Sequence, residues 1–141
     1  PNTAWVAIDA LGIWKGVGWS MVLFLAALQG IPVELYEAAA IDGADEKQQF
    51  LHITLPLIRA TLLFVTVMLV IGGFNVFISV YLMTGGGPLH RTEVVLSYMY
   101  NRAFGRLRFG YGASLSYVLA AIIVTINFVQ MRLFRRPTIE Y

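Results

Sequence analysis

Three long apolar runs divide the chain, and two polar segments separate them. The runs cover residues 16–33, 60–83 and 113–131, and none contains Asp, Glu, Lys or Arg. At about 1.5 Å of rise per residue, about 20 apolar residues in a helix cross the hydrocarbon core of a bilayer. Trp14 and Trp19, near the start of the first run, suit the membrane–water interface. The pattern therefore predicts an all-α, multi-pass transmembrane protein with about three spans.

The first polar segment, residues 32–59, begins with the signals of a short helix that ends in a sharp turn. Pro32 suits a first helical turn, where its missing N–H would have no partner anyway. Residues 38–40 are all alanine, the strongest helix former. Gly43 follows at a position where the left-handed conformation of a helix C-terminus favours glycine. The segment is also acidic, with Glu34, Glu37, Asp42, Asp45 and Glu46 against Lys47 and Arg59.

A second short helix is expected beyond this turn. Asp45 can cap its N-terminus, and Gln48 follows three residues later, as in a capping box. Pro56 disfavours α geometry at Leu55, so we expect the helix to break there and the next one to begin. The segment is thus predicted to be a helix-turn-helix element bounded by prolines. An ordered acidic element between two spans suggests a surface that is presented to a partner.

The second polar segment, residues 85–110, is predicted to be a loop with an interfacial helix. Three consecutive glycines followed by Pro88 end the second run. Residues 93–104 have the pattern of an amphipathic helix that lies at the membrane surface. Aromatic residues suited to headgroup depth are frequent in and after it: Tyr98, Tyr100, Phe104, Phe109 and Tyr111.

Few polar residues interrupt the runs, and these are candidates for a translocation path. Gly72 and Gly73 are expected to interrupt the second span, and Asn75 follows them at mid-depth. Asn127 lies near the far end of the third run. A polar side chain within a span usually faces protein or a water-filled cavity. Gly73, Asn75 and Asn127 therefore either line a path or make hydrogen bonds between helices.

Composition supports the membrane assignment and removes several classes of function. The chain has 141 residues, of which 58% are hydrophobic and 13% charged, with a mean hydropathy of +0.71. Its net charge of +2 comes from basic residues at the ends of the runs, so lipid headgroups and not nucleic acid are the expected partners. The absence of cysteine excludes disulfides and thiolate metal sites. His52 and His90 lack neighbouring ligands, and no cofactor or catalytic set is expected.

Charge alone does not orient the chain. Three spans place the segment 32–59 and the C-terminus on one side of the membrane, and the segment 85–110 on the other. Five basic residues fall on each side: Lys47, Arg59, Arg132, Arg135 and Arg136 on the first, and Lys15, Arg91, Arg102, Arg106 and Arg108 on the second. The positive-inside rule therefore gives a tie.

The first polar segment resembles a motif of a known family. Glu37, Ala38 and Ala39 are followed after three residues by Gly43, and after nine more by Ile53, one residue, Leu55 and Pro56. This spacing is that of the EAA motif of ABC importer permeases. The flanking residues 27–32 and 84–88 are similar to those of the maltose-type sugar permease subfamily. The resemblance covers roughly residues 14–136.

The resemblance implies a fold, partners and residue roles. Residues 1–141 would be the C-terminal part of an ABC transporter transmembrane domain, with about three further spans upstream, in a bacterial or archaeal cytoplasmic membrane. The segment 32–59 would be a coupling loop held by a separate cytoplasmic ATPase, which places that side in the cytosol. A second permease and an extracytoplasmic solute-binding protein would complete an importer for a sugar or a glycerol-phosphate-like solute.

The motif residues carry the coupling in this interpretation. Glu37, Ala38 and Ala39 would contact the ATPase, Glu37 through a basic group. Gly43 would give the turn that fits its groove, and Ile53, Leu55 and Pro56 would fix the lever to the second span. Taken singly, each residue also has an ordinary explanation, such as a surface acid, a helix C-cap or the start of a span. The joint spacing favours the coupling role.

Two other functions remain as alternatives. The chain could be a non-transporting membrane scaffold whose polar loop binds a partner. It could also be an ion-coupled carrier, although apolar runs without acids or bases argue against a proton relay in this part of the protein.

Overall fold

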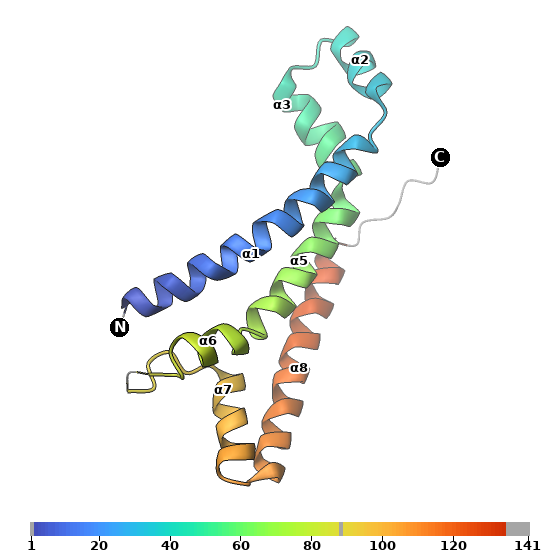
Figure 1. Ribbon diagram of the computed structural model, residues 1–141. Helices are drawn as coiled ribbons and strands as arrows, with labels where there is room; N and C mark the ends of the chain where they lie inside the picture. Colours follow the sequence, from blue (N-terminus) through green and yellow to red (C-terminus); the bar gives the residue numbers. More distant parts are fainter. Residues whose placement is uncertain (1, 88, 135–141) are drawn as a thin grey trace.

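The computed structural model describes residues 2–87 and 89–134, and this part of the chain is helical with no strand (Figure 1). The elements in order are α1 (Asn2–Gln29), α2 (Val33–Ile41), α3 (Glu46–Gln49), η1 (Phe50–Thr54), α4 (Leu55–Leu57), α5 (Arg59–Phe74), α6 (Phe77–Met83), α7 (Val95–Tyr100), η2 (Asn101–Gly105) and α8 (Phe109–Phe134). Both η elements are single π-helical turns. The all-α, multi-pass prediction is confirmed.

Three helical stretches are long and apolar enough to cross a membrane: Thr3–Gln29, Arg59–Met83 and Phe109–Phe134. The first differs most from the expected bounds, because α1 begins at Asn2 and ends before Gly30. Two isolated charges, Asp9 and Lys15, therefore lie within this helix. Both are exposed and precede the expected span of residues 16–33, so what the structure corrects is where the first span begins. The uncharged run is shorter than the helix. The helix continues through isolated charged residues because its backbone hydrogen bonds do not depend on the side chains.

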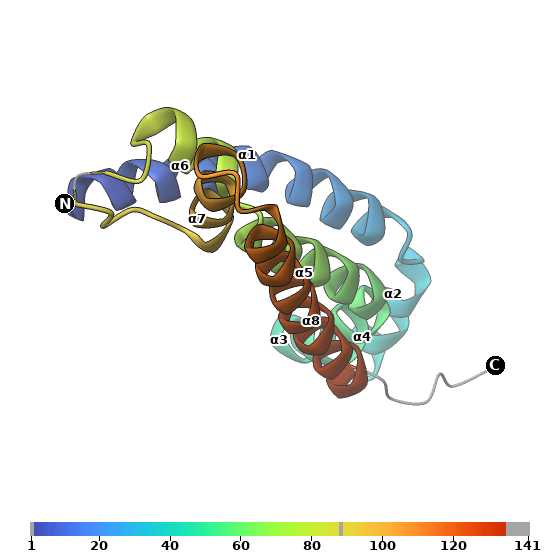
Figure 2. The ribbon, with the colours of Figure 1, turned by 90° about the horizontal axis from the view of Figure 1, so that it is seen from below.

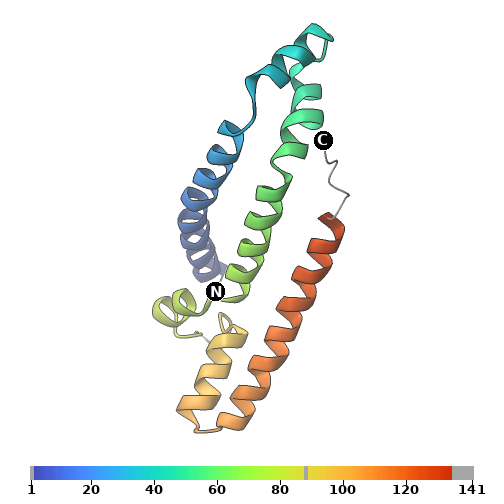
Figure 3. The same ribbon diagram turned by 90° about the vertical axis from the view of Figure 1, so that its right-hand side faces the viewer.

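Helix α5 is the central helix of the bundle. Figures 2 and 3 both show it between α1 and α8. Trp19 of α1 and Phe64 of α5 have ring centroids 6.1 Å apart. Between α5 and α8, the Arg59 guanidinium of α5 lies 6.0 Å from the centre of the Phe134 ring of α8. Val65 in α5 is 2% exposed, whereas most large apolar side chains on the long helices face outward, as expected for helices surrounded by lipid and by further helices.

The two polar segments lie at opposite ends of this bundle (Figure 1). Helices α2 and α3 project beyond the end of α1 at one end, and α6, α7 and their loop lie at the other. Arg135 and Arg136, two of the residues counted for orientation, lie outside the described residues, as does Pro88.

The second span is interrupted, but not at the expected position. Gly72 and Gly73 are both within α5, and the helix ends after Phe74. Asn75 and Val76 leave helical geometry, with ψ angles of 22° and 50°. The Asn75 side-chain amide donates to the Ile71 carbonyl oxygen at 2.9 Å. A short amide side chain competes in this way with the backbone for helix carbonyls. The break therefore lies at Asn75 and Val76, directly beyond the end of α5, and not at the glycine pair.

A close approach of two backbones fixes η2 against α8. A Cβ atom added at Gly112 of α8 would lie 2.8 Å from Cβ of Ala103 in η2, closer than side chains tolerate. At Gly110, two residues earlier, an added Cβ would meet nothing within 4 Å. Small residues at the start of α8 thus allow close packing between helices, and Gly112 is the position there that requires glycine.

Candidate functional site

The turn between α2 and α3 has the geometry of a Schellman motif. Gly43 adopts a φ angle of +81°, its N–H donates to the Ala40 carbonyl at 3.1 Å, and the Ala44 N–H donates to the Ala39 carbonyl at 2.9 Å. These two bonds satisfy carbonyls that the end of α2 would leave unpaired. The prediction that Gly43 ends the first short helix is confirmed. We call the element formed by residues 32–58 the elbow.

The second arm of the elbow begins at the predicted capping box. The Gln48 N–H donates to Oδ1 of Asp45 at 2.7 Å, and the Asp45 N–H donates to Oε1 of Gln48 at 2.9 Å. The Gln49 side-chain amide adds a bond of 3.2 Å to the Ala44 carbonyl. Both sides of the turn are therefore held by local hydrogen bonds, so the glycine joins two defined arms.

The arm does not break at Leu55, and this expectation is wrong. Leu55 has α-helical angles (φ −62°, ψ −42°), and its N–H donates to the carbonyl of Phe50 across the π-turn η1. In a regular α-helix, the Pro56 ring would clash with the carbonyl four residues earlier. The extra residue in the π-turn moves that carbonyl aside, so the helix continues through Pro56. The bend comes at Ile58 (φ −85°, ψ 5°), immediately before α5.

A hydrogen bond between the two arms closes the elbow, and no motif in the sequence indicated this bond. The Tyr36 hydroxyl lies 2.8 Å from Oγ1 of Thr54. Thr54 is 7% exposed and is the most buried residue of the elbow, followed by Ile58 at 8%. Tyr36 lies directly before the Glu-Ala-Ala triplet and Thr54 lies between the motif residues Ile53 and Leu55. Sequence spacing alone cannot show that two such residues meet across a turn.

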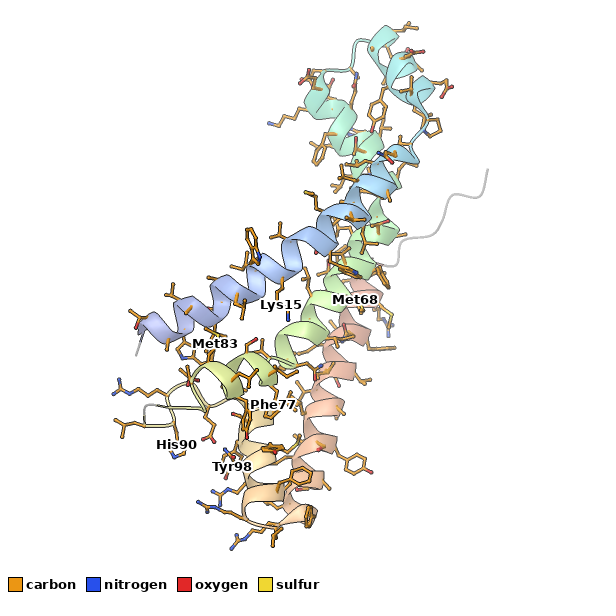
Figure 4. All side chains as sticks on the ribbon, in the orientation of Figure 1. Lys15, Met68, Phe77, Met83, His90 and Tyr98 are labelled. Atoms are coloured by element: carbon orange, nitrogen blue, oxygen red, sulfur yellow. The ribbon has the colours of Figure 1, made fainter. Side chains whose placement is uncertain are left out.

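The motif residues line different parts of the elbow. Glu37 and Ala38 are exposed on α2, Ala39 is half-buried beside them, and Gly43 is exposed at the tip. Ile53 is half-buried in η1, and Leu55 and Pro56 are exposed in α4. All five acids of the elbow are exposed: Glu34, Glu37, Asp42, Asp45 and Glu46. The elbow therefore presents an acidic, rigid surface at the end of the bundle (Figures 1 and 4).

The candidates for a translocation path are not brought together. Asn75 lies at the break between α5 and α6 and contributes to an apolar groove of about 600 Å³ that is also lined by Phe77, Tyr100 and Ala113. Gly73 is exposed on α5 and does not line this groove. Asn127 is 8% exposed on α8; its amide donates to the Ile123 carbonyl at 2.9 Å, and its Oδ1 has no partner among the described residues.

Comparison with known proteins places the chain in a family. Residues 1–136 match the family described as "Binding-protein-dependent transport system inner membrane component". The chain is 40% identical over 125 residues to the "Putative ABC transporter permease protein ORF1" of Caldicellulosiruptor sp. (strain Rt8B.4), covering 89% of each chain. It is 37% identical to the "Probable ABC transporter permease protein YurN" of Bacillus subtilis, covering 95% of this chain and 46% of that protein.

A third relative is the "Multiple sugar-binding transport system permease protein MsmF" of Streptococcus mutans, at 36% identity over 96% of this chain and 47% of that protein. The chain thus spans less than half the length of the two larger relatives. The family and the three apolar helices place it in the cytoplasmic membrane as a multi-pass component. The chain belongs to the family of inner-membrane components of binding-protein-dependent transport systems.

Proposed function

We propose that this chain is part of the permease subunit of a binding-protein-dependent ABC importer and that the elbow couples it to a separate cytoplasmic ATPase. The solute is a sugar or a glycerol-phosphate-like molecule, the classes named in relatives such as the "sn-glycerol-3-phosphate transport system permease protein UgpA" of Rhizobium meliloti. The observation that carries the proposal is the elbow, because the motif residues lie on a protruding element whose arms are braced by Tyr36 and Thr54.

The elbow has the properties that mechanical coupling requires. A lever must keep its shape when a partner pushes it, and the capping box, the Schellman turn and the bond between the arms fix the geometry on both sides of Gly43. The exposed carboxylate of Glu37 suits a basic group on the ATPase. Ile53, Leu55 and Pro56 lie where the second arm enters α5 through the bend at Ile58, so movement of the arm is passed directly to the central helix.

The break between α5 and α6 suits a translocation path. Non-helical backbone at membrane depth is tolerated where it faces protein or a water-filled cavity, and interrupted helices often mark the solute site of transporters. Asn75 is proposed to contact solute at this break, and Gly73 to leave room beside it. Asn127 is proposed to line the path nearer the elbow, where its Oδ1 is free to accept a hydrogen bond from water or solute.

The proposed partners follow from this role. ATP hydrolysis is assigned to the separate ATPase, because the family is that of the inner-membrane components of these transport systems. A second permease and an extracytoplasmic solute-binding protein complete the importer. The elbow end of the bundle then lies in the cytosol and the α6–α7 end outside.

Substitutions at Gly43 test the coupling role. The full-length protein, reconstituted with its ATPase and binding protein, is assayed for ATP hydrolysis and for solute uptake. Asn tolerates a positive φ angle, and an added Cβ meets nothing within 4 Å in this chain, so Gly43→Asn preserves the turn. We expect Gly43→Asn to lower the uptake per ATP hydrolysed, because its side chain enters the ATPase groove.

Asp42→Asn, an exposed neighbour of similar size, is the control and should leave this ratio unchanged. Normal uptake per ATP in the Gly43 variant would contradict the coupling role. If ATP is not needed for uptake and a proton-gradient uncoupler abolishes it, the chain is an ion-coupled carrier. If the elbow binds a protein that is no ATPase and no solute moves, it is a scaffold.

A further inference from the structure

A pocket of about 450 Å³, lined mainly by residues with polar side chains, lies at the end of the bundle opposite the elbow. The side chains that give it its chemistry come from the loop after α6 and from α7 and η2: His90, Glu93, Tyr98, Asn101, Arg102 and Arg106. It is separate from the groove beside Asn75, which lies against other residues of the same helices, among them Leu96 and Met99. The proposed coupling and translocation roles use none of the pocket residues.

The charges in the pocket favour an anion. The Arg102 guanidinium lies over the Tyr98 ring, 4.8 Å from its centre, which orients the cation without neutralising it. Arg106 follows about one helical turn later, at the end of η2. The carboxylate of Glu93 is already engaged, because His90 Nδ1 lies 3.1 Å from its Oε2. Two guanidinium groups therefore face the pocket without a carboxylate partner among the described residues, a pair suited to phosphate oxygens.

Two leucines beside the pocket favour a lipid over a soluble anion. Leu89 is 84% exposed and Leu107 is 73% exposed. Leu89 directly precedes His90, and Leu107 directly follows Arg106. Both lie in loops and have positive φ angles, 56° and 54°, a conformation that is unfavourable for leucine. Exposed leucines on strained loops beside arginines are suited to the membrane interface, where apolar side chains reach the acyl region and cations reach phosphates.

We propose that this pocket binds the phosphate group of an anionic phospholipid such as phosphatidylglycerol. Arg102 and Arg106 hold the phosphate oxygens, Asn101 donates to the headgroup, and Leu89 and Leu107 insert beside the acyl chains. The volume of about 450 Å³ lies within the range of about 300–1,000 Å³ for pockets that hold small molecules, and so suits a lipid headgroup. If the elbow lies in the cytosol, the pocket faces the outer leaflet of the membrane. Only this choice of leaflet rests on the proposed function; the binding of the phosphate does not.

Lipid retention by the full-length protein in complex with its partner subunits tests the proposal. The complex is equilibrated with detergent micelles that contain phosphatidylcholine and phosphatidylglycerol and is then washed, and the retained lipids are quantified by mass spectrometry. We expect enrichment of phosphatidylglycerol over its share in the micelles. Arg102→Gln and Arg106→Gln should each lower this enrichment about fivefold, the factor for about 1 kcal/mol per basic residue near an anionic surface.

Arg91→Gln and Arg108→Gln are the matched controls, because they remove the same charge at the same end of the bundle but do not line the pocket. The proposal is wrong if these controls lose as much enrichment as the pocket variants, or if the pocket variants lose none. A second arm adds soluble glycerol phosphate at millimolar concentration. Displacement of the phospholipid by this ester, with Leu89→Ser and Leu107→Ser having no effect, would assign the pocket to a soluble anion. Because retention is measured without uptake, failure here leaves the coupling proposal untouched.

Discussion

The hydroxyl of Tyr36 lies 2.8 Å from Oγ1 of Thr54, so a single hydrogen bond joins the two arms of the elbow across the turn at Gly43. Tyr36 belongs to α2 and Thr54 to the π-turn η1, the place where the second arm departs from regular α geometry. π-turns within helices frequently occur at functional sites. The bond therefore fixes the angle of the arms at the point where the helix is least regular.

Removal of this bond should loosen the elbow. Tyr36→Phe and Thr54→Val each delete one hydroxyl and keep the shape of the side chain. A hydrogen bond of this kind contributes about 1 kcal/mol, so each variant should lower the ratio of uptake to ATP hydrolysis in the reconstituted importer. The double variant should behave like either single one, because both changes remove the same interaction.

Thr54→Ser is the control for this prediction, since it keeps the hydroxyl and should keep the ratio near its normal value. Additive losses in the double variant would mean that the two hydroxyls act separately. A normal ratio in both single variants would show that the bond has no part in coupling.

Loss of the capping box should fray the second arm locally. Asp45→Ala removes the carboxylate that accepts from the Gln48 N–H, and such caps contribute about 1 kcal/mol. Hydrogen exchange, measured by mass spectrometry, should become about fivefold faster at the amides of residues 46–50, and Asp45→Ser should restore protection. Asp42→Ala removes the same charge from the C-cap residue of α2, which caps through its backbone N–H. Equal acceleration at residues 46–50 in this variant would point to charge and not to the capping box.

Gly112 is expected to be the least tolerant glycine at the start of α8. Gly112→Ala would place a methyl group 2.8 Å from Cβ of Ala103, and such overpacking destabilises by about 1–3 kcal/mol. The purified full-length protein should unfold at a lower temperature than the unmodified one. Gly110→Ala adds the same methyl group where nothing lies within 4 Å, so it should unfold normally. Similar losses at both positions would contradict the close contact between η2 and α8.

Asn75 is expected to influence solute handling through the helix break. Asn75→Leu removes the side-chain bond to the Ile71 carbonyl and favours continuation of α5, so the KM for uptake should rise up to about tenfold, the effect of losing one hydrogen bond. Asn75→Ser is the control, because a serine hydroxyl can bond to the same carbonyl. If the KM is unchanged in the leucine variant, the break does not contribute to the solute site.

Much of this fold follows from local rules. The turn at Gly43 and the capping box of Asp45 and Gln48 were predictable because each depends on residues within a few positions of one another. The break in the second span was expected, but it lies at Asn75 and Val76 and not at the glycine pair. The roles of the motif residues and of Asn127 stay proposals.

The sequence by itself determined which segments are helical and apolar, where the first polar segment turns, and which motif it carries, because these properties depend on neighbouring residues and on hydrophobicity. Only the tertiary structure decided that Tyr36 meets Thr54, that Pro56 sits within a continuous arm, and that Arg102 and Arg106 face one pocket. The first of these contacts joins residues on opposite sides of a turn. The other two depend on π-turns, because the extra residue in a π-turn changes which side chains lie on the same face of the helix. The spacing of hydrophobic and polar residues along the sequence does not indicate these contacts, because each depends on how the helices pack.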